Sequence, residues 1–273
     1  MLESKTRSGR TEKFEYDNKN RIVKTSSGRE FRTITYNRDG SVEIARYNFD
    51  KSERLATSHF YRDGNTITVL DNSQIPETLT VNEDGYIVSS ERSTDWMSVK
   101  TYQYQDGNLI KLTDASRQVS SNTEHLHIVE FEYDDKKSPF LNCNTPGWLL
   151  QYLAGSVSTD LGLKNNIIEV RSDVRGAELT TFKYEYEYDG DGFPTKQTMR
   201  VSHEYGTDEE ITFFTYRGEA DTVNHDTHYT PDDDNKDDTE PTAASAYLTT
   251  MFMRRDMNMI RQVTWPPKSG KTA

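Results

Sequence analysis

The dipeptide Asp-Gly recurs along the chain at nearly regular intervals. Its copies are Asp39-Gly40, Asp63-Gly64, Asp84-Gly85, Asp106-Gly107 and Asp191-Gly192, and the first four lie 24, 21 and 22 residues apart. Each follows a run rich in β-branched and aromatic residues, which are common in strands. Because both positions of an Asp-Gly pair tolerate the positive φ of a tight turn, the repeat predicts a series of β-hairpins.

A second set of turn-forming residues lies about midway between these pairs. Its members are Ser26-Ser27-Gly28, Asp50-Lys51-Ser52, Asp71-Asn72-Ser73, Ser93-Thr94-Asp95 and Asp114-Ala115-Ser116. The chain is therefore predicted to reverse about every 10 to 12 residues, which gives strands of roughly 6 to 9 residues. No helix-length segment separates these strands, so parallel βαβ units are excluded. The sequence predicts a mainly β fold, an antiparallel up-and-down meander of about 14–16 strands that is strongly curved or barrel-like.

An apolar residue and a tyrosine stand two positions apart just before many of the turns. The pairs are Phe14 with Tyr16, Ile34 with Tyr36, Tyr102 with Tyr104, Phe131 with Tyr133, Tyr186 with Tyr188 and Phe214 with Tyr216. Residues two apart in a strand share a face, so stacked hairpins would align these rings in a ladder across neighbouring strands. The ladder has two interpretations. The favoured one is a core whose hydroxyls stay at a wet rim. The other is a ligand platform made of Tyr16, Tyr36, Tyr104, Tyr133 and Tyr188.

The repeat stops after Tyr133, and a helical pattern appears. Thr145 and Pro146 are typical of a helix start, and Gly155 is typical of its end. Trp148, Leu149, Tyr152 and Leu153 fall at helical spacing between them. The sequence therefore predicts one short helix near 146–154 that fills the concave side of the curled sheet and binds nothing.

The pattern divides the chain into five parts. Residues 1–10 are expected to be a flexible segment, 11–218 the meander with a helical insertion at 138–165, 219–242 an acidic linker or loop, 243–265 a closing hairpin or helix, and 266–273 a tail. Nine acidic residues against Lys236 between Glu219 and Glu240 give that stretch a charge of −8, out of −12 for the chain. Because these acids lack the order of a calcium loop, a solvated linker is favoured over a calcium site.

The charge and the cysteine count exclude several classes of protein. Lys and Arg total 33 and Asp and Glu total 45, which argues against a nucleic-acid partner. The only cysteine, Cys143, excludes an intramolecular disulfide and a cysteine-based zinc site. The sequence contains no run of 18 apolar residues, so it predicts no membrane-spanning helix. The polar start Met1–Arg7 is no signal peptide, so either the protein is cytoplasmic or its leader has been removed.

Motifs for catalysis or cofactor binding are absent from the sequence. It has no Gly-x-Ser-x-Gly, no phosphate-binding glycine loop and no dinucleotide fingerprint, so no cofactor and no catalytic residue is expected. His125 and His127 would share a strand face as metal ligands do, but an exposed strand pair without metal is favoured. His225 and His228 with Asp221 and Asp226 form a second weak metal candidate in the acidic stretch.

Two families resemble this chain. The turn Tyr16–Ile22 resembles the tyrosine–aspartate repeats of bacterial rearrangement-hotspot shells. The Tyr-x-x-Asp-Gly hairpins occur together with the segments Lys137–Asn142, Lys164–Asn166 and Tyr186–Thr195. In these residues, and over Thr11 to Tyr216, the chain more specifically resembles uncharacterised domains of Bacteroides-group gut bacteria described as porin-like.

The resemblance to the porin-like domains implies a barrel-like sheet on an exported protein, commonly a lipoprotein, with no established catalytic residues. It thereby implies a periplasmic, outer-membrane-attached or extracellular location. A soluble barrel is nevertheless expected, because the strands appear shorter than the roughly 9–11 residues of a membrane barrel and carry charge on both faces.

The sequence thus predicts a non-catalytic binding or scaffolding module at the cell envelope, with a glycan or an envelope protein as partner. One alternative is a hydrolase that acts on glycans or lipids with acids in a concave pocket. Another is a subunit that self-assembles through unpaired strand edges.

Overall fold

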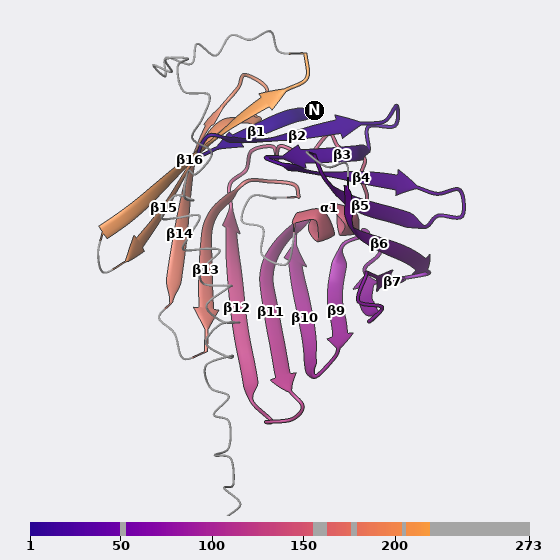
Figure 1. Ribbon diagram of the computed structural model, residues 1–273. Helices are drawn as coiled ribbons and strands as arrows, with labels where there is room; N and C mark the ends of the chain where they lie inside the picture. The colour runs from indigo at the N-terminus through magenta and orange to yellow at the C-terminus, as the bar shows by residue number, and fades with distance from the viewer. Residues whose placement is uncertain (50–52, 155–162, 176–178, 204–205, 219–273) are drawn as a thin grey trace, which may run out of the picture. The chain divides into compact units, whose positions relative to one another are not determined.

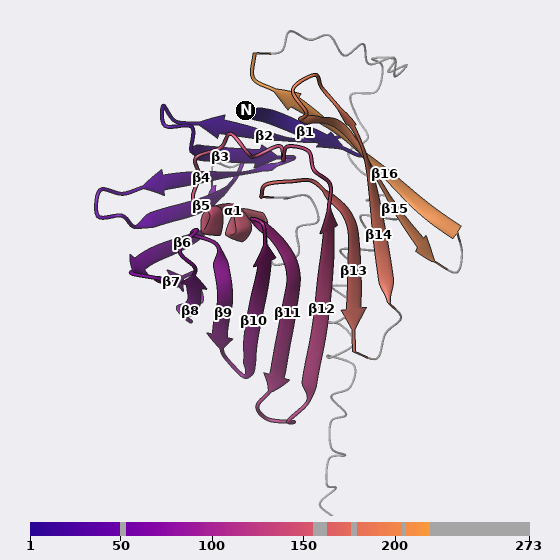
Figure 2. The same cartoon turned by 180° about the vertical axis from the view of Figure 1, so that it is seen from behind.

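Antiparallel strands pair side by side in sequence order around a closed ring. The computed structural model describes residues 1–49, 53–154, 163–175, 179–203 and 206–218. The chain divides into two units, Met1–Asn224 and His225–Ala273, and every described residue belongs to the first. Each of the sixteen strands of the first unit pairs with its neighbours in sequence, and β16 pairs with β1 to close a barrel (Figures 1 and 2).

The elements follow one another along the chain with short connections. They are β1 (Leu2–Arg7), β2 (Arg10–Tyr16), β3 (Ile22–Ser27), β4 (Glu30–Tyr36), β5 (Val42–Asn48), β6 (Glu53–Asp63), β7 (Thr66–Leu70), β8 (Glu77–Val81), β9 (Ile87–Ser93), β10 (Trp96–Gln105), β11 (Asn108–Gln118), β12 (Glu124–Tyr133), α1 (Gly147–Ala154), β13 (Ile167–Val174), β14 (Thr180–Tyr188), β15 (Pro194–His203) and β16 (Gly206–Tyr216). The predicted meander with one short helix is therefore confirmed as a closed sixteen-stranded barrel.

All five Asp-Gly pairs lie at chain reversals, as predicted. Asp106 and Gly107, between β10 and β11, have φ values of 52° and 79°, the left-handed region that such a turn requires at both positions. These turns stand at one end of the barrel, together with the turn 17–21, the end of β12 and the start of β13. We call this end the aspartate–glycine rim, and the other end, which carries turns such as 8–9, 28–29 and 71–76, the opposite rim.

The turn predicted at Asp114-Ala115-Ser116 is wrong, because these residues lie inside β11. Asp114 and Ser116 face the lumen there, opposite Lys100 and Ser98 of β10. The predicted strand lengths are also wrong for eight strands: six have 10 or 11 residues, and β7 and β8 have 5. Strand length therefore gives no argument against a membrane barrel.

The structure of the N-terminal segment also differs from the prediction. Residues 1–10 were expected to be flexible, but Leu2–Arg7 form β1, which pairs with β16 on one side and with β2 on the other. Leu2 is 1% exposed and belongs to the apolar core. Closure of the sheet by 243–265 was also expected. Those residues, the acidic stretch 219–242 and the tail 266–273 lie outside the described residues, and β1 provides the closing pairing.

The apolar core lies inside the barrel near the aspartate–glycine rim. Helix α1 stands within the ring of strands (Figures 1 and 2), and its Trp148, Leu149 and Leu150 are buried against inward side chains such as Phe60 and Ile22. The predicted helix and its filling of the concave side are thus confirmed. Its predicted end, Gly155, lies outside the described residues.

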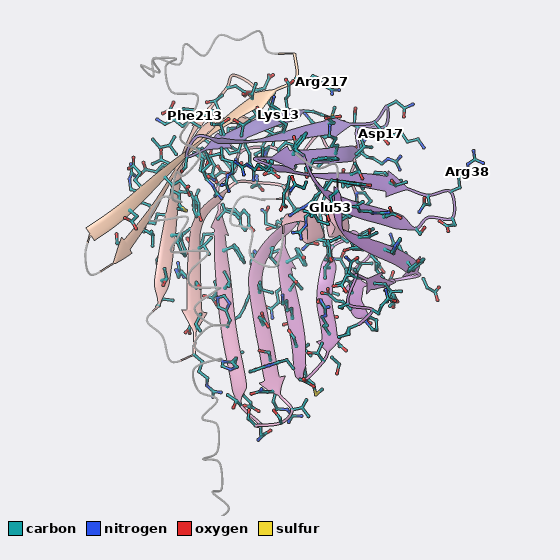
Figure 3. All side chains as sticks on the ribbon, in the orientation of Figure 1. Lys13, Asp17, Arg38, Glu53, Phe213 and Arg217 are labelled. Carbon is teal, nitrogen blue, oxygen red and sulfur yellow. The ribbon has the colours of Figure 1, made fainter. Side chains whose placement is uncertain are left out.

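Side chains project from both faces of the barrel wall, and Figure 3 shows Arg38 of the β4–β5 turn pointing away from it. Inward and outward positions alternate along each strand, as in β10, where every second residue is exposed. Within the described part of the chain, no helix has the length and apolar character needed to cross a membrane.

Candidate functional site

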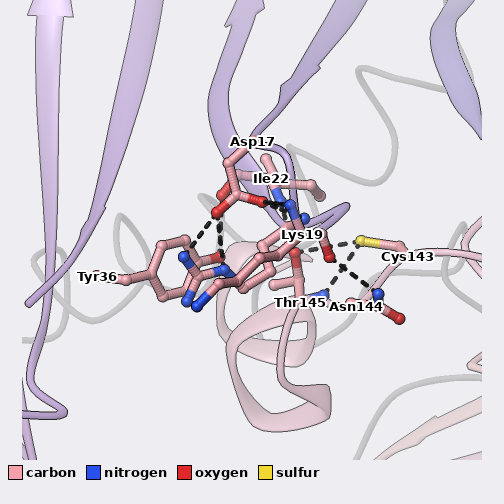
Figure 4. A network of polar contacts seen from close by, with 8 residues as sticks. Asp17, Lys19, Ile22, Tyr36, Cys143, Asn144 and Thr145 are labelled. Atoms are coloured by element: carbon pink, nitrogen blue, oxygen red, sulfur yellow. Dashed lines mark hydrogen bonds and ion pairs between the residues drawn. The ribbon is translucent and has the colours of Figure 1, made fainter.

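The segment that carries α1 is fixed to two turns of the aspartate–glycine rim. At the β2–β3 turn, the backbone N–H of Ile22 donates to Oγ1 of Thr145 at 2.7 Å (Figure 4). At the β8–β9 turn, the N–H of Trp148 donates to the carbonyl oxygen of Gly85 at 2.9 Å. Because the barrel contributes backbone groups to both hydrogen bonds, the start of α1 is held at the rim. The last turn of the helix extends into the lumen.

The β2–β3 turn is itself organised by a carboxylate. Oδ2 of Asp17 lies 2.6 Å from Nη2 of Arg21, whose guanidinium lies 4.0 Å from the ring centre of Tyr36 (Figure 4). Desolvation alone would raise the pKa of Asp17, but hydrogen bonds from Arg21 and from the N–H of Lys19 outweigh it and lower the pKa. Burial raises the pKa of Tyr36 to about 12, so its phenol is neutral and donates a hydrogen bond at physiological pH.

The tyrosines that precede the turns share one hydrogen bond. In six of the eight even-numbered strands, a tyrosine near the end of the strand donates its hydroxyl to the carbonyl oxygen of the first or second residue of the preceding strand. These bonds run from Tyr16 to Leu2 (2.7 Å), Tyr36 to Ile22 (2.9 Å), Tyr104 to Ile87 (2.7 Å), Tyr133 to Leu109 (2.7 Å), Tyr186 to Ile167 (2.8 Å) and Tyr216 to Pro194 (2.8 Å). We call them the tyrosine latches. They tie six even strands to the odd strands that precede them at the aspartate–glycine rim.

The strand register confirms that the two residues of each apolar–tyrosine pair share the inward face of the sheet. It does not confirm the predicted ladder of rings across neighbouring strands. Tyrosines occupy alternate strands, and an aliphatic or proline residue of the odd strand stands between them. Of the five predicted platform tyrosines, four use their hydroxyls in latches, and Tyr188 donates to the carboxylate of Asp134. None of the five lines either of the two cavities described below. Their role as a platform stays a prediction.

Replacing Tyr133 by phenylalanine is expected to lower the free energy of unfolding by about 1 kcal/mol. The change leaves the carbonyl oxygen of Leu109 without its 2.7 Å hydrogen bond and keeps the ring in place. Urea denaturation followed by circular dichroism measures the effect. Tyr61→Phe is the matched control, because Tyr61 is 49% exposed on β6, and equal losses in the two variants would contradict a specific role for the latch.

A cavity of about 470 Å³ lies inside the barrel beside the last turn of α1. We call it the arginine cavity, because Arg32 of β4 and Arg46 of β5 both line it. The rest of its wall comes from inward residues of β5 and β6, from the β7–β8 connection and from α1: Ile44, Ala56, Ser58, Asp71, Asn72, Ser73, Tyr152, Leu153 and Ala154. Its size and mixed polar and apolar lining are typical of sites for small ligands.

The two arginines are direct register partners on neighbouring strands. Among the described residues, Arg32 makes one hydrogen bond, to the carbonyl oxygen of Leu153 at 3.4 Å, and Arg46 has Glu30 at 3.9 Å. Asp71 is already paired: its carboxylate lies 3.1 Å from Arg92. The hydroxyl of Ser73 and the Arg92 guanidinium hold the pKa of Asp71 below its usual range, so it is an anion at neutral pH.

A second cavity of about 220 Å³ lies on the other side of Arg32. Arg32, Leu153 and Ala154 line both cavities, and an ion pair of Lys5 with Glu12 at 3.2 Å completes the polar side of the smaller one. Arg32 therefore stands between two hollows of the lumen.

The histidines predicted as an exposed strand pair lie on the inward face of β12 instead. His127 is 3% exposed, and its Nε2 lies 2.8 Å from Oγ of Ser172 on β13. His127 is the register partner of Asp114 on β11, which also faces the lumen. The expected exposed histidine pair is therefore wrong. No group of three metal-binding side chains gathers among the residues that the structure describes. His225, His228, Asp221 and Asp226 lie outside them.

Sequence reasoning missed Arg32 and Arg46, although the sequence holds a signal for both. Arg32 is in phase with Ile34 and Tyr36, and Arg46 is in phase with Val42 and Ile44. A cationic residue that continues the apolar face of a predicted strand is a candidate for the lumen, since inward and outward positions alternate.

A closed sixteen-stranded antiparallel barrel, with a short helix and a polar cavity inside it, defines the class of this protein. The chain is similar to the crystal structure of a porin-like protein from Bacteroides uniformis. That match covers 78% of this chain and 97% of the other, with 14% sequence identity and a TM-score of 0.36. No family model matches the chain, and no curated protein matches it. The resemblance to tyrosine–aspartate repeats is therefore without support, and the assignment of a barrel rests on the strand pairing of this chain.

Proposed function

We propose that the protein is a non-catalytic binding module, an exported and soluble barrel that holds a small glycan in its lumen at the cell envelope. The observation that carries this proposal is the arginine cavity. Its lining combines charged, hydroxyl and aromatic side chains with apolar ones, and it lies inside a wall whose strands fix their positions.

Solubility is supported by the ion pairs on the outer face of the barrel. Arg171 lies 2.6 Å from Glu169, and Arg200 lies 2.7 Å from Glu185 and 2.8 Å from Glu209. A lipid-facing band would have to bury such charges in hydrocarbon, which costs several kcal/mol per charge near the midplane. We therefore expect the chain to be purified without detergent as a monodisperse species in light scattering. Aggregation that only detergent reverses would contradict this part of the proposal.

Binding in the cavity is tested with a filled variant. A panel of mono- and disaccharides is expected to raise the melting temperature of the wild type, because a ligand that binds only the folded state stabilises it. Ala56→Trp places a large side chain in the cavity and should abolish the shift. Thr57→Trp, one residue along the same strand and on the outer face, should retain it. A panel that shifts neither the wild type nor Thr57→Trp would refute the binding role.

Envelope location is the part of the proposal that comes from the sequence resemblance to exported domains. Fractionation of the source cells should place the protein in the periplasm, in the outer membrane fraction as a lipoprotein, or in the medium. Recovery with cytoplasmic markers would contradict it.

Hydrolysis is the second candidate function, and one observation favours it. Ser172, His127 and Asp114 stand on three adjacent strands, with the serine hydroxyl at hydrogen-bond distance from the imidazole. We place it second because Ser172 is 8% exposed and His127 is 3% exposed, which leaves a substrate little access. Turnover of ester or glycoside substrates that disappears in Ser172→Ala would reverse the order.

Self-assembly through strand edges is not supported by the described strands, which form a closed barrel. The hypothesis required unpaired edges, and β1 and β16 pair with each other. A monomer at high concentration in the light-scattering experiment would exclude it.

A further inference from the structure

We propose that Arg32 and Arg46 bind the carboxylate of an acidic saccharide, a uronic acid, in the arginine cavity. This inference rests on the proposed function and names the ligand class for the same cavity.

The two guanidinium groups project from directly opposed residues of β4 and β5 toward the same cavity. Like charges at opposed positions destabilise a sheet. The partners available in the described residues compensate weakly, because Arg32 has only the carbonyl oxygen of Leu153 at 3.4 Å and Arg46 has Glu30 at 3.9 Å. A carboxylate bound between the two guanidinium groups would reduce their mutual repulsion, and a guanidinium binds a carboxylate with two parallel hydrogen bonds.

The charges around the pair favour a single negative charge on the ligand. Asp71 lines the same cavity and stays ionised, held by Ser73 and by Arg92 at 3.1 Å. Glu30 contributes a further negative charge near Arg46. Arg32, Arg46 and Arg92 against Asp71 and Glu30 leave a net charge of +1 at the site, which one carboxylate balances and a dianionic phosphate exceeds.

The remaining lining suits a sugar ring. Ser58 presents a hydroxyl group, which donates and accepts hydrogen bonds as sugar hydroxyls require, whereas the hydroxyl of Ser73 is already bonded to Asp71 and Arg92. Tyr152 lines the cavity with a ring that is held edge-on against Phe60, with the ring centres 4.7 Å apart. Ile44 and Leu153 supply apolar contacts. Such a wall binds a ring that has both hydroxyl groups and C–H faces.

Isothermal titration calorimetry on the full chain tests the inference with three probes: D-glucuronate, D-glucose and inorganic phosphate. The wild type should bind glucuronate at least tenfold more tightly than glucose or phosphate, and higher salt should weaken the binding. Arg32→Gln should weaken glucuronate binding at least tenfold, about 1.4 kcal/mol at 25 °C. Arg54→Gln is the matched control: Arg54 faces outward on β6 beside Glu43, and its loss should leave the affinity unchanged.

Stability gives an independent readout. Because Arg32 and Arg46 repel each other, Arg32→Gln should leave the melting temperature of the ligand-free protein equal to or above that of the wild type. Arg32→Lys keeps the charge and loses the paired hydrogen bonds, so its affinity for glucuronate should fall between those of Arg32→Gln and the wild type.

The outcomes separate this inference from the proposed function. If glucose binds as tightly as glucuronate, or if Arg32→Gln binds glucuronate like the wild type, the arginines do not select the ligand, although the barrel still binds saccharides. If phosphate binds as tightly, the choice of carboxylate is wrong. If no saccharide binds the wild type, both proposals fail. A melting temperature that drops sharply in Arg32→Gln would assign the pair a structural role and overturn the inference.

Discussion

Replacement of Trp148 by alanine should lower the free energy of unfolding by about 3 to 5 kcal/mol, the range for large-to-small changes at buried aromatic residues. Trp148 is 4% exposed on α1, and its ring centre lies 5.4 Å from that of Phe60 on β6. Its removal leaves a hollow where the helix meets the barrel wall, and the wall cannot collapse because its strands are closed in a ring. Urea denaturation followed by far-ultraviolet circular dichroism measures the loss.

Trp96→Ala is the matched control for this prediction. Trp96 begins β10 near the opposite rim, is partly exposed and packs against His125 with ring centres 5.3 Å apart. The same atoms are deleted, so the loss of stability should be at most half that of Trp148→Ala. If Trp148→Ala does not fold, Trp148→Phe, which keeps much of the volume, should fold and should unfold at a lower denaturant concentration than the wild type. Equal losses at the two tryptophans would contradict the role of α1 as the central filling of the lumen.

Deletion of residues 1–7 is expected to have the second large effect, because it opens the barrel. β1 pairs with β16 through Leu2–Arg7 and with β2 through Ser4–Arg7. Without it, two long strands expose unpaired backbone N–H and C=O groups, which template pairing between chains. The truncated protein should self-associate in analytical ultracentrifugation and lose its cooperative unfolding transition.

A synthetic peptide of residues 1–9 serves as the control for this deletion. Added to the truncated chain, it can occupy the gap between β2 and β16 and should restore a monomeric particle, because strand addition satisfies both edges. A scrambled peptide of the same composition should not. A truncated protein that stays monomeric with the unfolding transition of the wild type would show that β1 is dispensable for closure.

The turns and the helix were predicted well because their signals are local. Asp-Gly meets the backbone requirement of a tight turn with two residues, as Asp106 and Gly107 show with φ values of 52° and 79°. The helix carries its own start signal in Pro146, which accepts hydrogen bonds from the N–H groups of Leu149 and Leu150. Neither feature depends on distant parts of the chain.

The wrong turn at 114–116 and the wrong N-terminal segment have one shared cause: away from α1, the side chains that face the lumen are polar. Asp114 and Ser116 were assigned to a turn because they are polar, yet they face the interior of the barrel opposite Lys100 and Ser98. The N-terminal segment has no apolar run to mark it as a strand, yet Lys5 and Arg7 occupy inward positions of β1 opposite Glu12 and Arg10. A strand whose inward side faces charged groups lacks the alternation by which strands are recognised.

The candidate site depends even more on distant residues. Arg32 and Arg46 belong to an ordinary hairpin, and only the arrival of Tyr152 and Leu153 from α1, more than a hundred residues later, completes the wall of the cavity that they line. The phase of the arginines with Ile34 and Ile44 marks them as inward, but it does not show which segment will cover them.

From its sequence alone, this chain determines its Asp-Gly reversals, the alternation of its apolar strands and where a helix begins, because each of these choices is made by a few neighbouring residues. The tertiary structure decides that the first and last of the described strands meet, that the lumen is apolar at one rim and charged beyond it, and that α1 stands inside the ring. Those outcomes follow from contacts between residues as far apart as Leu2 and Tyr216, whose energies depend on the closed geometry of the whole sheet and leave no local mark.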